Sequence, residues 1–210
     1  MSIRREYGRK NFHCCDVFWC LVFYRVLATG RTGGDMIGVD LDGTLLNYMG
    51  TDNKTEVNYT LLEVLRGKEI WIITNQGGIP FGLQWLRDSR GKSKKYPLPS
   101  DFMFRLHLAI ESAKEYGVTV KGVSVCFYHP HADMDDVAQA HDATVALARG
   151  LSVPFYGFVG KAWRKPNPLM LKGLELDSFI GDSIEDEVAA LHAADVPFVK
   201  IEQFTGNDED

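Results

Sequence analysis

Two aspartates separated by one residue follow a short apolar run, Ile37–Val39, in the sequence DLDGT at positions 40–44. Alternation along an extended chain places Asp40 and Asp42 on the same side. A carboxylate can attack phosphorus and form an aspartyl phosphate, which divides one difficult displacement into two easier ones. A second carboxylate can protonate the leaving oxygen and later deprotonate water. Asp40 and Asp42 are therefore candidates for a nucleophile and a general acid/base.

Taken alone, the same residues are also compatible with an acidic turn after a strand. A calcium-binding loop is a further alternative, but it requires regularly spaced oxygen ligands and a glutamate at its twelfth position, and Glu56 lies well beyond that position. The catalytic interpretation requires further residues later in the chain that could act together with Asp40 and Asp42.

A second apolar run ends in the sequence ITNQGG at positions 73–78. The hydroxyl of Thr74 can donate to a phosphate oxygen, and glycine allows the backbone to approach an anion closely. We expect Thr74 to be catalytic and Asn75, Gln76 and Gly77 to contact the substrate, although the same residues also form ordinary turns.

Two later segments supply a cation and further acids. Lys165, in Trp-Arg-Lys-Pro, can neutralise a phosphate and the nucleophile, and the neighbouring Arg164 is an expected substrate contact. Asp182 and Asp186 follow a strand and a glycine and lie at the start of an expected helix, with Asp182 in the turn before it. Carboxylates of this kind bind magnesium together with substrate phosphate, but acids at a helix start are also common capping residues.

These four segments, each at the end of an expected strand, resemble in order and residue type the four motifs of the haloacid dehalogenase (HAD) superfamily, over Met36 to about Ile201. The resemblance implies an Mg²⁺-dependent hydrolase with Asp40 as nucleophile and Asp42 as general acid/base. It implies that Mg²⁺ is held by Asp40, the main-chain carbonyl of Asp42, Asp182 and Asp186. It also identifies Thr74 and Lys165 as the second and third motif residues.

Within that superfamily an Asp-x-Asp start favours phosphatases that act on phosphoric monoesters. Two groups share the sequence motifs Thr-Asn-Gln-Gly and Arg-Lys-Pro. They are the polynucleotide kinase 3'-phosphatases, and the histidinol-phosphate and heptose-bisphosphate phosphatases. The segment 153–166 resembles the first group, so the expected substrate is a phosphorylated DNA or RNA 3' end. A small-molecule phosphatase acting on histidinol phosphate, a sugar phosphate or a nucleotide is the alternative. A non-catalytic HAD-fold binding protein is the third.

Two further segments could bear on the substrate. Cys126, His129, His131 and His141 only partly match the zinc loop of the histidinol-phosphate group, and lone histidines beside a strand end are more often surface or site-lining residues. The basic run Arg87–Lys95 could follow a nucleic-acid backbone with Trp85 and Tyr96 stacking on bases, or could be a solvated loop.

The Gly91-Lys92-Ser93 triplet in that run is no Walker loop, because Leu86 stands where the first glycine is required.

Composition sets limits on these functions. The chain has 210 residues, 45% of them hydrophobic, and a net charge of -5, which argues against a dedicated nucleic-acid binder. Three of its four cysteines lie near the N-terminus, so no disulfide framework is indicated and a cytoplasmic location is expected. The apolar run Val17–Tyr24 is too short to span a bilayer, although the basic residues before it leave a degenerate signal peptide open. No obligate protein partner can be inferred.

Alternation of short strands and helical patterns predicts an α/β fold, with a parallel Rossmann-like sheet covered by helices on both faces. Residues 1–35 are expected to be a poorly ordered extension and 36–210 one phosphatase domain, with Leu45–Glu69 too short for more than a minimal cap. The expected strands are Ile37–Val39, Ile70–Ile73, Val123–Phe127, Phe155–Phe158, Phe179–Ile180 and Phe198–Ile201. The expected helices are Asn58–Arg66, Ser100–Tyr116, Asp135–Arg149, Pro166–Leu174 and Ile184–Ala193. The helical spacing of Met103, Leu106, Ile110 and Ala113 indicates a core-facing stripe ended by Gly117.

Overall fold

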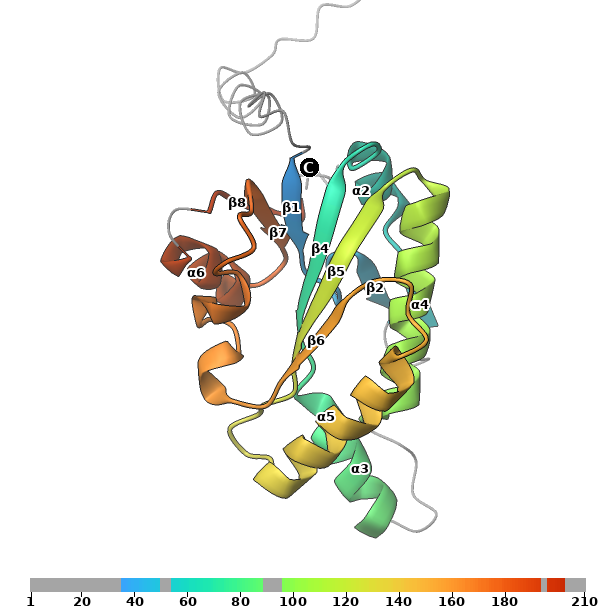
Figure 1. Ribbon diagram of the computed structural model, residues 1–210, viewed down its shortest axis with the longest axis vertical. Coiled ribbons are helices and arrows are strands. Elements are labelled where there is room, and N and C mark those ends of the chain that lie inside the picture. Colours follow the sequence, from blue (N-terminus) through green and yellow to red (C-terminus); the bar gives the residue numbers. More distant parts are fainter. Residues whose placement is uncertain (1–34, 50–53, 89–95, 194–195, 203–210) are drawn as a thin grey trace, which may run out of the picture. The chain divides into compact units, whose positions relative to one another are not determined.

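Six parallel strands form the central sheet in the order β6-β5-β4-β1-β7-β8 (Figure 1). They are β1 (Met36–Val39), β4 (Glu69–Asn75), β5 (Thr119–Cys126), β6 (Phe155–Phe158), β7 (Ser178–Gly181) and β8 (Phe198–Lys200). The central strands are largely buried, as expected for a parallel sheet covered on both faces. All six expected strands are present, and β5 begins earlier than expected.

The computed structural model describes residues 35–49, 54–88, 96–193 and 196–202. The expected N-terminal extension, apart from Asp35, lies outside these ranges. No helix within them is both long and apolar enough to cross a bilayer.

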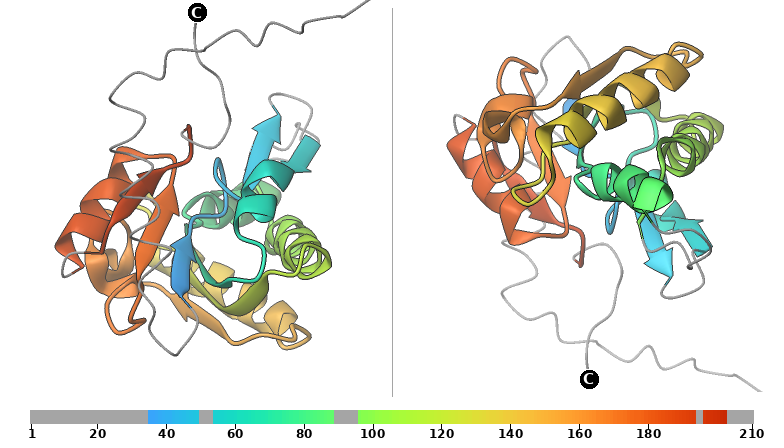
Figure 2. Two further views of the ribbon diagram at one scale, coloured as in Figure 1. Left: turned by 90° about the horizontal axis from the view of Figure 1, so that it is seen from above. Right: turned by 90° about the horizontal axis from the view of Figure 1, so that it is seen from below.

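The helices are α2 (Tyr59–Val64), α3 (Gly78–Asp88), α4 (Pro99–Glu115), α5 (Met134–Ala148) and α6 (Ile184–His192), with short 3₁₀ turns η2 (Lys161–Trp163) and η3 (Pro168–Met170). Helices α2, α4 and α5 lie on one side of the sheet and α6 on the other (Figures 1 and 2). From β1 the strand order runs outward through β4 to β6 and, in the other direction, through β7 to β8. Right-handed crossovers then place the helices on opposite faces. The fold is therefore the expected Rossmann-like α/β arrangement.

Helix α4 packs an apolar stripe onto this sheet. Phe102, Leu106 and Ala113 are fully buried, and Met103 and Ile110 are nearly so. Gly117 has φ +75° just beyond the helix, a conformation that glycine adopts without a steric penalty. The expected core stripe and stop signal are confirmed.

The prediction of a helix at residues 166–174 is wrong. Residues 166–174 contain only the short turn η3, because Asn167 precedes Pro168 and is held in extended conformation with ψ 142°. The residue before a proline avoids the helical region. Gly173, at φ +85°, then turns the chain away.

Sequence patterns also gave no sign of α3 or of the antiparallel pair β2 (Leu46–Met49) and β3 (Lys54–Val57). Helix α3 contains Pro80 and two glycines, which are poor helix formers. A Cβ on Gly82 would lie 2.1 Å from the main-chain oxygen of Pro97, so the glycine is required for close packing. Tertiary contact therefore overrides local propensity here.

Gly82→Ala should destabilise the protein by about 1–3 kcal/mol, because the added Cβ pushes α3 away from the backbone at Pro97. Gly150→Ala is the matched control, since the nearest atom to its Cβ is Leu147 O at 3.9 Å. Urea unfolding measures both. Equal stability of the two variants would contradict the packing argument.

Candidate functional site

A buried lysine lies between two aspartates at the carboxyl edge of the sheet. Lys165 Nζ is 2.6 Å from Asp40 Oδ1 and 2.5 Å from Asp186 Oδ1, and it donates to the main-chain oxygen of Ile73 at 3.0 Å. Only 3% of Lys165, 6% of Asp40 and 1% of Asp186 is exposed. Ions buried to this extent are stable only when they are paired, so these three residues from separate segments depend on one another.

The main chain of Lys165 is held by Asn75, the last residue of β4. Asn75 Nδ2 donates to Lys165 O and Lys165 N donates to Asn75 Oδ1, both at 3.1 Å. Asn75 was predicted to contact substrate and it does line the cavity described below, but its amide atoms are used to position the lysine.

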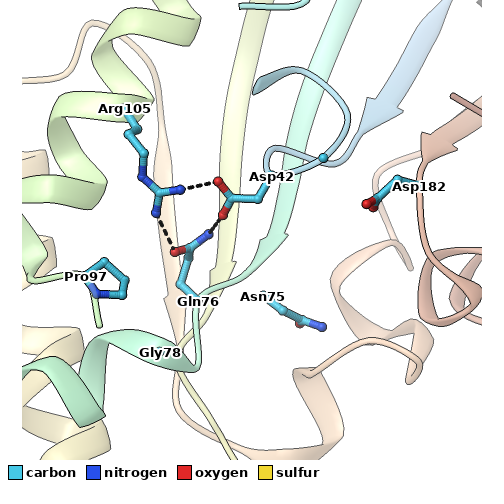
Figure 3. A pocket seen from close by; sticks show the side chains of 8 residues that line it. Asp42, Asn75, Gln76, Gly78, Pro97, Arg105 and Asp182 are labelled. Carbon is cyan, nitrogen blue, oxygen red and sulfur yellow. Dashed lines mark hydrogen bonds and ion pairs between the residues drawn. The ribbon is translucent and has the colours of Figure 1, made fainter. Parts of the chain in front are cut away.

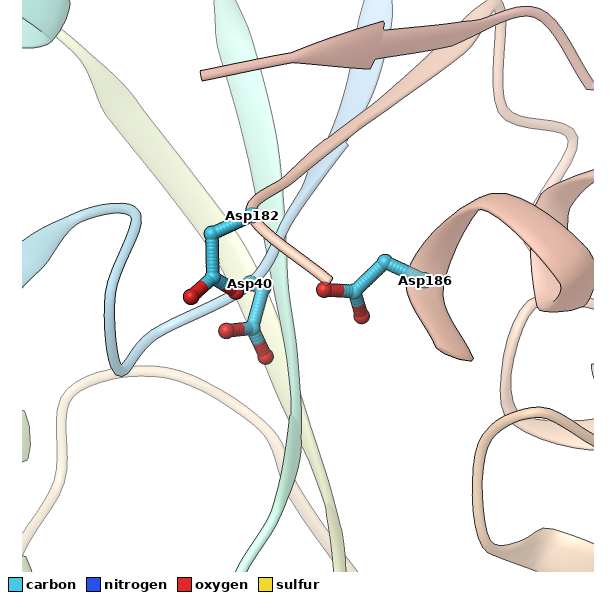
Figure 4. A group of neighbouring side chains, drawn as sticks. All are labelled: Asp40, Asp182 and Asp186. Carbon is cyan, nitrogen blue, oxygen red and sulfur yellow. The ribbon is translucent and has the colours of Figure 1, made fainter. Parts of the chain in front are cut away.

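Three carboxylates gather at this point. Asp40 follows β1, Asp182 lies in the bend after β7, and Asp186 is in the first turn of α6, with one oxygen of each within 4.8 Å of the others (Figure 4). Asp40 and Asp186 are buried, whereas Asp182 is exposed. The three acids and Lys165 together carry a formal surplus of two negative charges when all are ionised. Hard oxygen donors with this surplus fit a divalent cation.

Asp186 has a second function in its own helix. Its Oδ2 accepts from Ser183 Oγ at 2.7 Å and from Ser183 N at 3.2 Å, and Ser183 Oγ accepts from Asp186 N at 3.2 Å. This is the capping box of α6. Asp186 is thus both a capping residue and an ion-pair partner of Lys165, while Asp182 precedes the helix as expected.

Gly43 allows Asp182 to approach the loop after β1. It has φ +85°, and a Cβ at this position would lie 2.1 Å from Asp182 Oδ2. Any other residue would be strained and would displace that carboxylate. The glycine of the DLDGT sequence therefore completes the carboxylate cluster.

Burial raises the pKa of Asp40 to about 8, with the negative charge of Asp186 adding to the rise and Lys165 opposing it. Burial alone would lower the pKa of Lys165, but Asp40 and Asp186 outweigh it and the net shift is upward. The pKa of Asp182 is raised by partial desolvation of its carboxylate and by the negative charge of Asp186. The cluster without a bound cation is therefore short of positive charge.

A second group surrounds Asp42. Gln76 Nε2 donates to Asp42 Oδ2 at 2.5 Å, Arg105 Nη1 donates to Asp42 Oδ1, and Arg105 Nη2 donates to Gln76 Oε1 at 3.3 Å (Figure 3). These residues line a cavity of about 410 Å³ together with Gly43, Asn75, Gly78, Pro97 and Asp182. Arg105 was missed by sequence reasoning. The available signal was a charged residue next to Leu106 within the apolar stripe of α4.

The remaining predicted site residues lie around these two groups. Thr74 is buried, and its Oγ1 accepts from Gln76 Nε2 at 3.0 Å. Arg164 Nη1 donates to Tyr128 O at 3.2 Å and would lie 3.0 Å from a Cβ on Gly77. All the predicted site residues thus occur at one edge of the sheet, and their predicted roles in substrate contact stay predictions.

The alternative zinc residues do not form a metal cluster within the described chain, where the aspartate trio is the sole group of three or more suitable side chains. Cys126 is buried beside Gly160 O, and burial raises its pKa to about 11, which disfavours a thiolate ligand. His141 instead packs edge-on against Phe127.

Most of the basic run, residues 89–95, lies outside the described residues. Arg87 pairs with the buried Asp136 at 2.7 Å. The ring of Tyr96 packs on Phe81, with centroids 5.3 Å apart. The predicted nucleic-acid contact of this run stays a prediction.

No protein-family model and no curated protein matches the sequence.

Without added metal, the protein should lose stability as the pH rises from 5 to 8. The folded-state pKa of Asp40, about 8, is above its ordinary value of 3.8, so the stability that depends on its proton is present below pH 3.8 and lost as the pH approaches 8. Asp40→Asn should flatten this dependence, and Glu111→Gln, an exposed change on α4, should not. Thermal unfolding in EDTA measures the slopes. An unchanged slope for Asp40→Asn would contradict the assigned pKa shift.

A divalent cation should raise the melting temperature of the EDTA-treated protein, because it binds the folded carboxylate cluster and not the unfolded chain. Asp182→Asn and Gly43→Ala should each reduce this rise, the first by removing a ligand and the second by displacing it. Glu185→Gln, an exposed neighbour in α6, should retain the rise. Equal loss in the Glu185 control would show binding to surface charge instead.

Proposed function

We propose that this chain is a magnesium-dependent phosphomonoesterase that forms an aspartyl phosphate on Asp40. The observation that carries the proposal is the buried centre in which Lys165 pairs with both Asp40 and Asp186. Asp182 lies beside these carboxylates, and Asp42 lines the same cavity as Asp182. These are residues that the resemblance to the HAD motifs singled out in the sequence. Because buried charge is costly, a purely structural role would be better served by apolar residues.

The residues divide the reaction between them. The Asp40 carboxylate attacks phosphorus, the bond to the leaving oxygen breaks, and Asp42 gives that oxygen its proton. Asp42 then takes a proton from water, which attacks phosphorus and releases orthophosphate from Asp40. Lys165 fixes Asp40 and offsets its charge, and we expect the Thr74 hydroxyl to donate to phosphate oxygens.

The donor set fits Mg²⁺, which prefers oxygen ligands and usually retains several waters. Asp40, Asp182 and the main-chain carbonyl of Asp42 would hold it. Asp186 is the weaker ligand of the trio, since one oxygen faces Lys165 and the other accepts from Ser183. Bound there, the ion would favour the carboxylate form of Asp40 and offset the charge of the phosphate.

For the substrate we propose a polynucleotide 3' phosphate. Among the described residues, the insertion between the first two motif segments contributes only the β2–β3 pair and the short helix α2, so this insertion supplies at most a small cap there. An open site favours a large substrate, and the Arg164 guanidinium lies at the same edge. A small phosphate ester is the alternative.

Phosphate release should be measured with Mg²⁺ on a 3'-phosphorylated oligonucleotide beside histidinol phosphate, heptose bisphosphate and nucleoside monophosphates. We expect the highest kcat/KM for the oligonucleotide. Asp40→Asn should lower kcat by roughly 10³-fold or more, because an amide is a poor nucleophile, while Glu111→Gln stays active.

A higher kcat/KM for a small phosphate ester would leave the proposed mechanism standing and would contradict the proposed polynucleotide substrate. Activity retained in Asp40→Asn would reject the mechanism. No release from any ester would favour a non-catalytic binding protein.

A further inference from the structure

Arg105 is the one charged side chain on the buried face of α4, a helix whose other buried side chains include Phe102, Leu106 and Ala109. It is only 7% exposed, so a guanidinium occupies a buried position among apolar side chains. A guanidinium is buried in this way only when its partners are well placed. Its partners include Asp42 and Gln76, both candidate site residues.

The three side chains form a closed ring. Asp42 Oδ1 accepts from Arg105 and Oδ2 accepts from Gln76, and Arg105 also donates to Gln76 (Figure 3). Gln76 is itself tied to Thr74 Oγ1. A carboxylate with one donor on each oxygen cannot rotate freely, so the plane of the Asp42 carboxylate is fixed. Asp42 and Arg105 both line the cavity, but Asp42 keeps 31% of its side chain exposed and Arg105 only 9%.

We propose that Arg105 is a positioning residue for proton transfer, which acts through Asp42 by fixing the orientation of its carboxylate. The proposal rests on the phosphomonoesterase function proposed above. When the leaving oxygen takes the proton from Asp42, a negative charge appears on that carboxylate beside the guanidinium. Arg105 therefore stabilises the group that has just lost its proton and holds it in place to accept one from water.

Esters with different leaving groups can distinguish a role in proton transfer from a role in phosphate binding or in folding. An alkyl alcohol is a poor leaving group and needs a proton as the phosphorus–oxygen bond breaks, whereas 4-nitrophenolate leaves without one. The value of kcat/KM reports only steps up to formation of the aspartyl phosphate, so it isolates the protonation of the leaving oxygen from the later attack of water. A loss of Asp42 orientation should therefore affect alkyl esters selectively.

The test compares kcat/KM for an alkyl phosphate, such as a 3'-phosphorylated oligonucleotide or glycerol phosphate, with that for 4-nitrophenyl phosphate. Arg105→Met should lower the alkyl value by roughly 100-fold and the nitrophenyl value by less than about 5-fold. Asp42→Asn should show the same selectivity. Arg66→Met, which removes an exposed arginine paired with Glu63, should change neither value.

Equal losses for both esters in Arg105→Met would overturn the proposal. If the melting temperature of Arg105→Met is unchanged, equal losses of kcat/KM would show that Arg105 binds the phosphate group common to both esters. If the melting temperature is lowered, they would show that Arg105 only holds α4 against the loop after β1. If Arg105→Met does not fold, Arg105→Lys replaces it in the same comparison, since lysine keeps the charge but cannot donate to both partners in one plane. Hydrolysis of neither ester by the wild type would instead reject the phosphomonoesterase function, and the role of Arg105 with it.

Discussion

The burial of the Lys165 ammonium is the constraint on which the site depends. Removed from water, it must be surrounded by acceptors, and it finds them in Asp40, Asp186 and the main-chain oxygen of Ile73. These belong to the ends of β1 and β4 and the start of α6. Satisfying one charge therefore requires three elements that are distant in sequence to meet at the same edge of the sheet.

Strand order explains why they meet there. Strand β1 lies between β4 and β7, and the chain winds outward from it in both directions. At such a switch point the loops after adjacent strands diverge to opposite faces and leave a crevice at the carboxyl ends. Asp40 and Asp182 directly follow β1 and β7, and Thr74 is the second-to-last residue of β4. Gly43 and Gly181 then permit contacts that a side chain would prevent, since a Cβ on Gly181 would lie 2.6 Å from Asp186 Cβ.

The polar residues around this centre are largely used to hold others in place. Asn75 forms two hydrogen bonds with the main chain of Lys165, and Gln76 donates a hydrogen bond to the carboxylate of Asp42. Catalysis by a preorganised site needs such supporting contacts, because the reacting groups are productive only in a narrow range of orientations. The amides that sequence reasoning assigned to the substrate are thus also part of the framework that orients the acids and the lysine.

The sequence by itself determined the α/β class, the six strands and the residue types of the site, because apolar runs that end in acids, a hydroxyl or amides are local patterns. It could not show α3, whose glycine and proline residues oppose a helix until Pro97 packs against Gly82, and it predicted a helix at residues 166–174 that the Asn167–Pro168 pair prevents. Nor could it show that Arg105 faces Asp42, because that pairing depends on how α4 crosses the sheet. Local chemistry can be read along the chain, but only the tertiary structure decided which side chains share a hydrogen bond, since that is set by packing between segments distant in sequence.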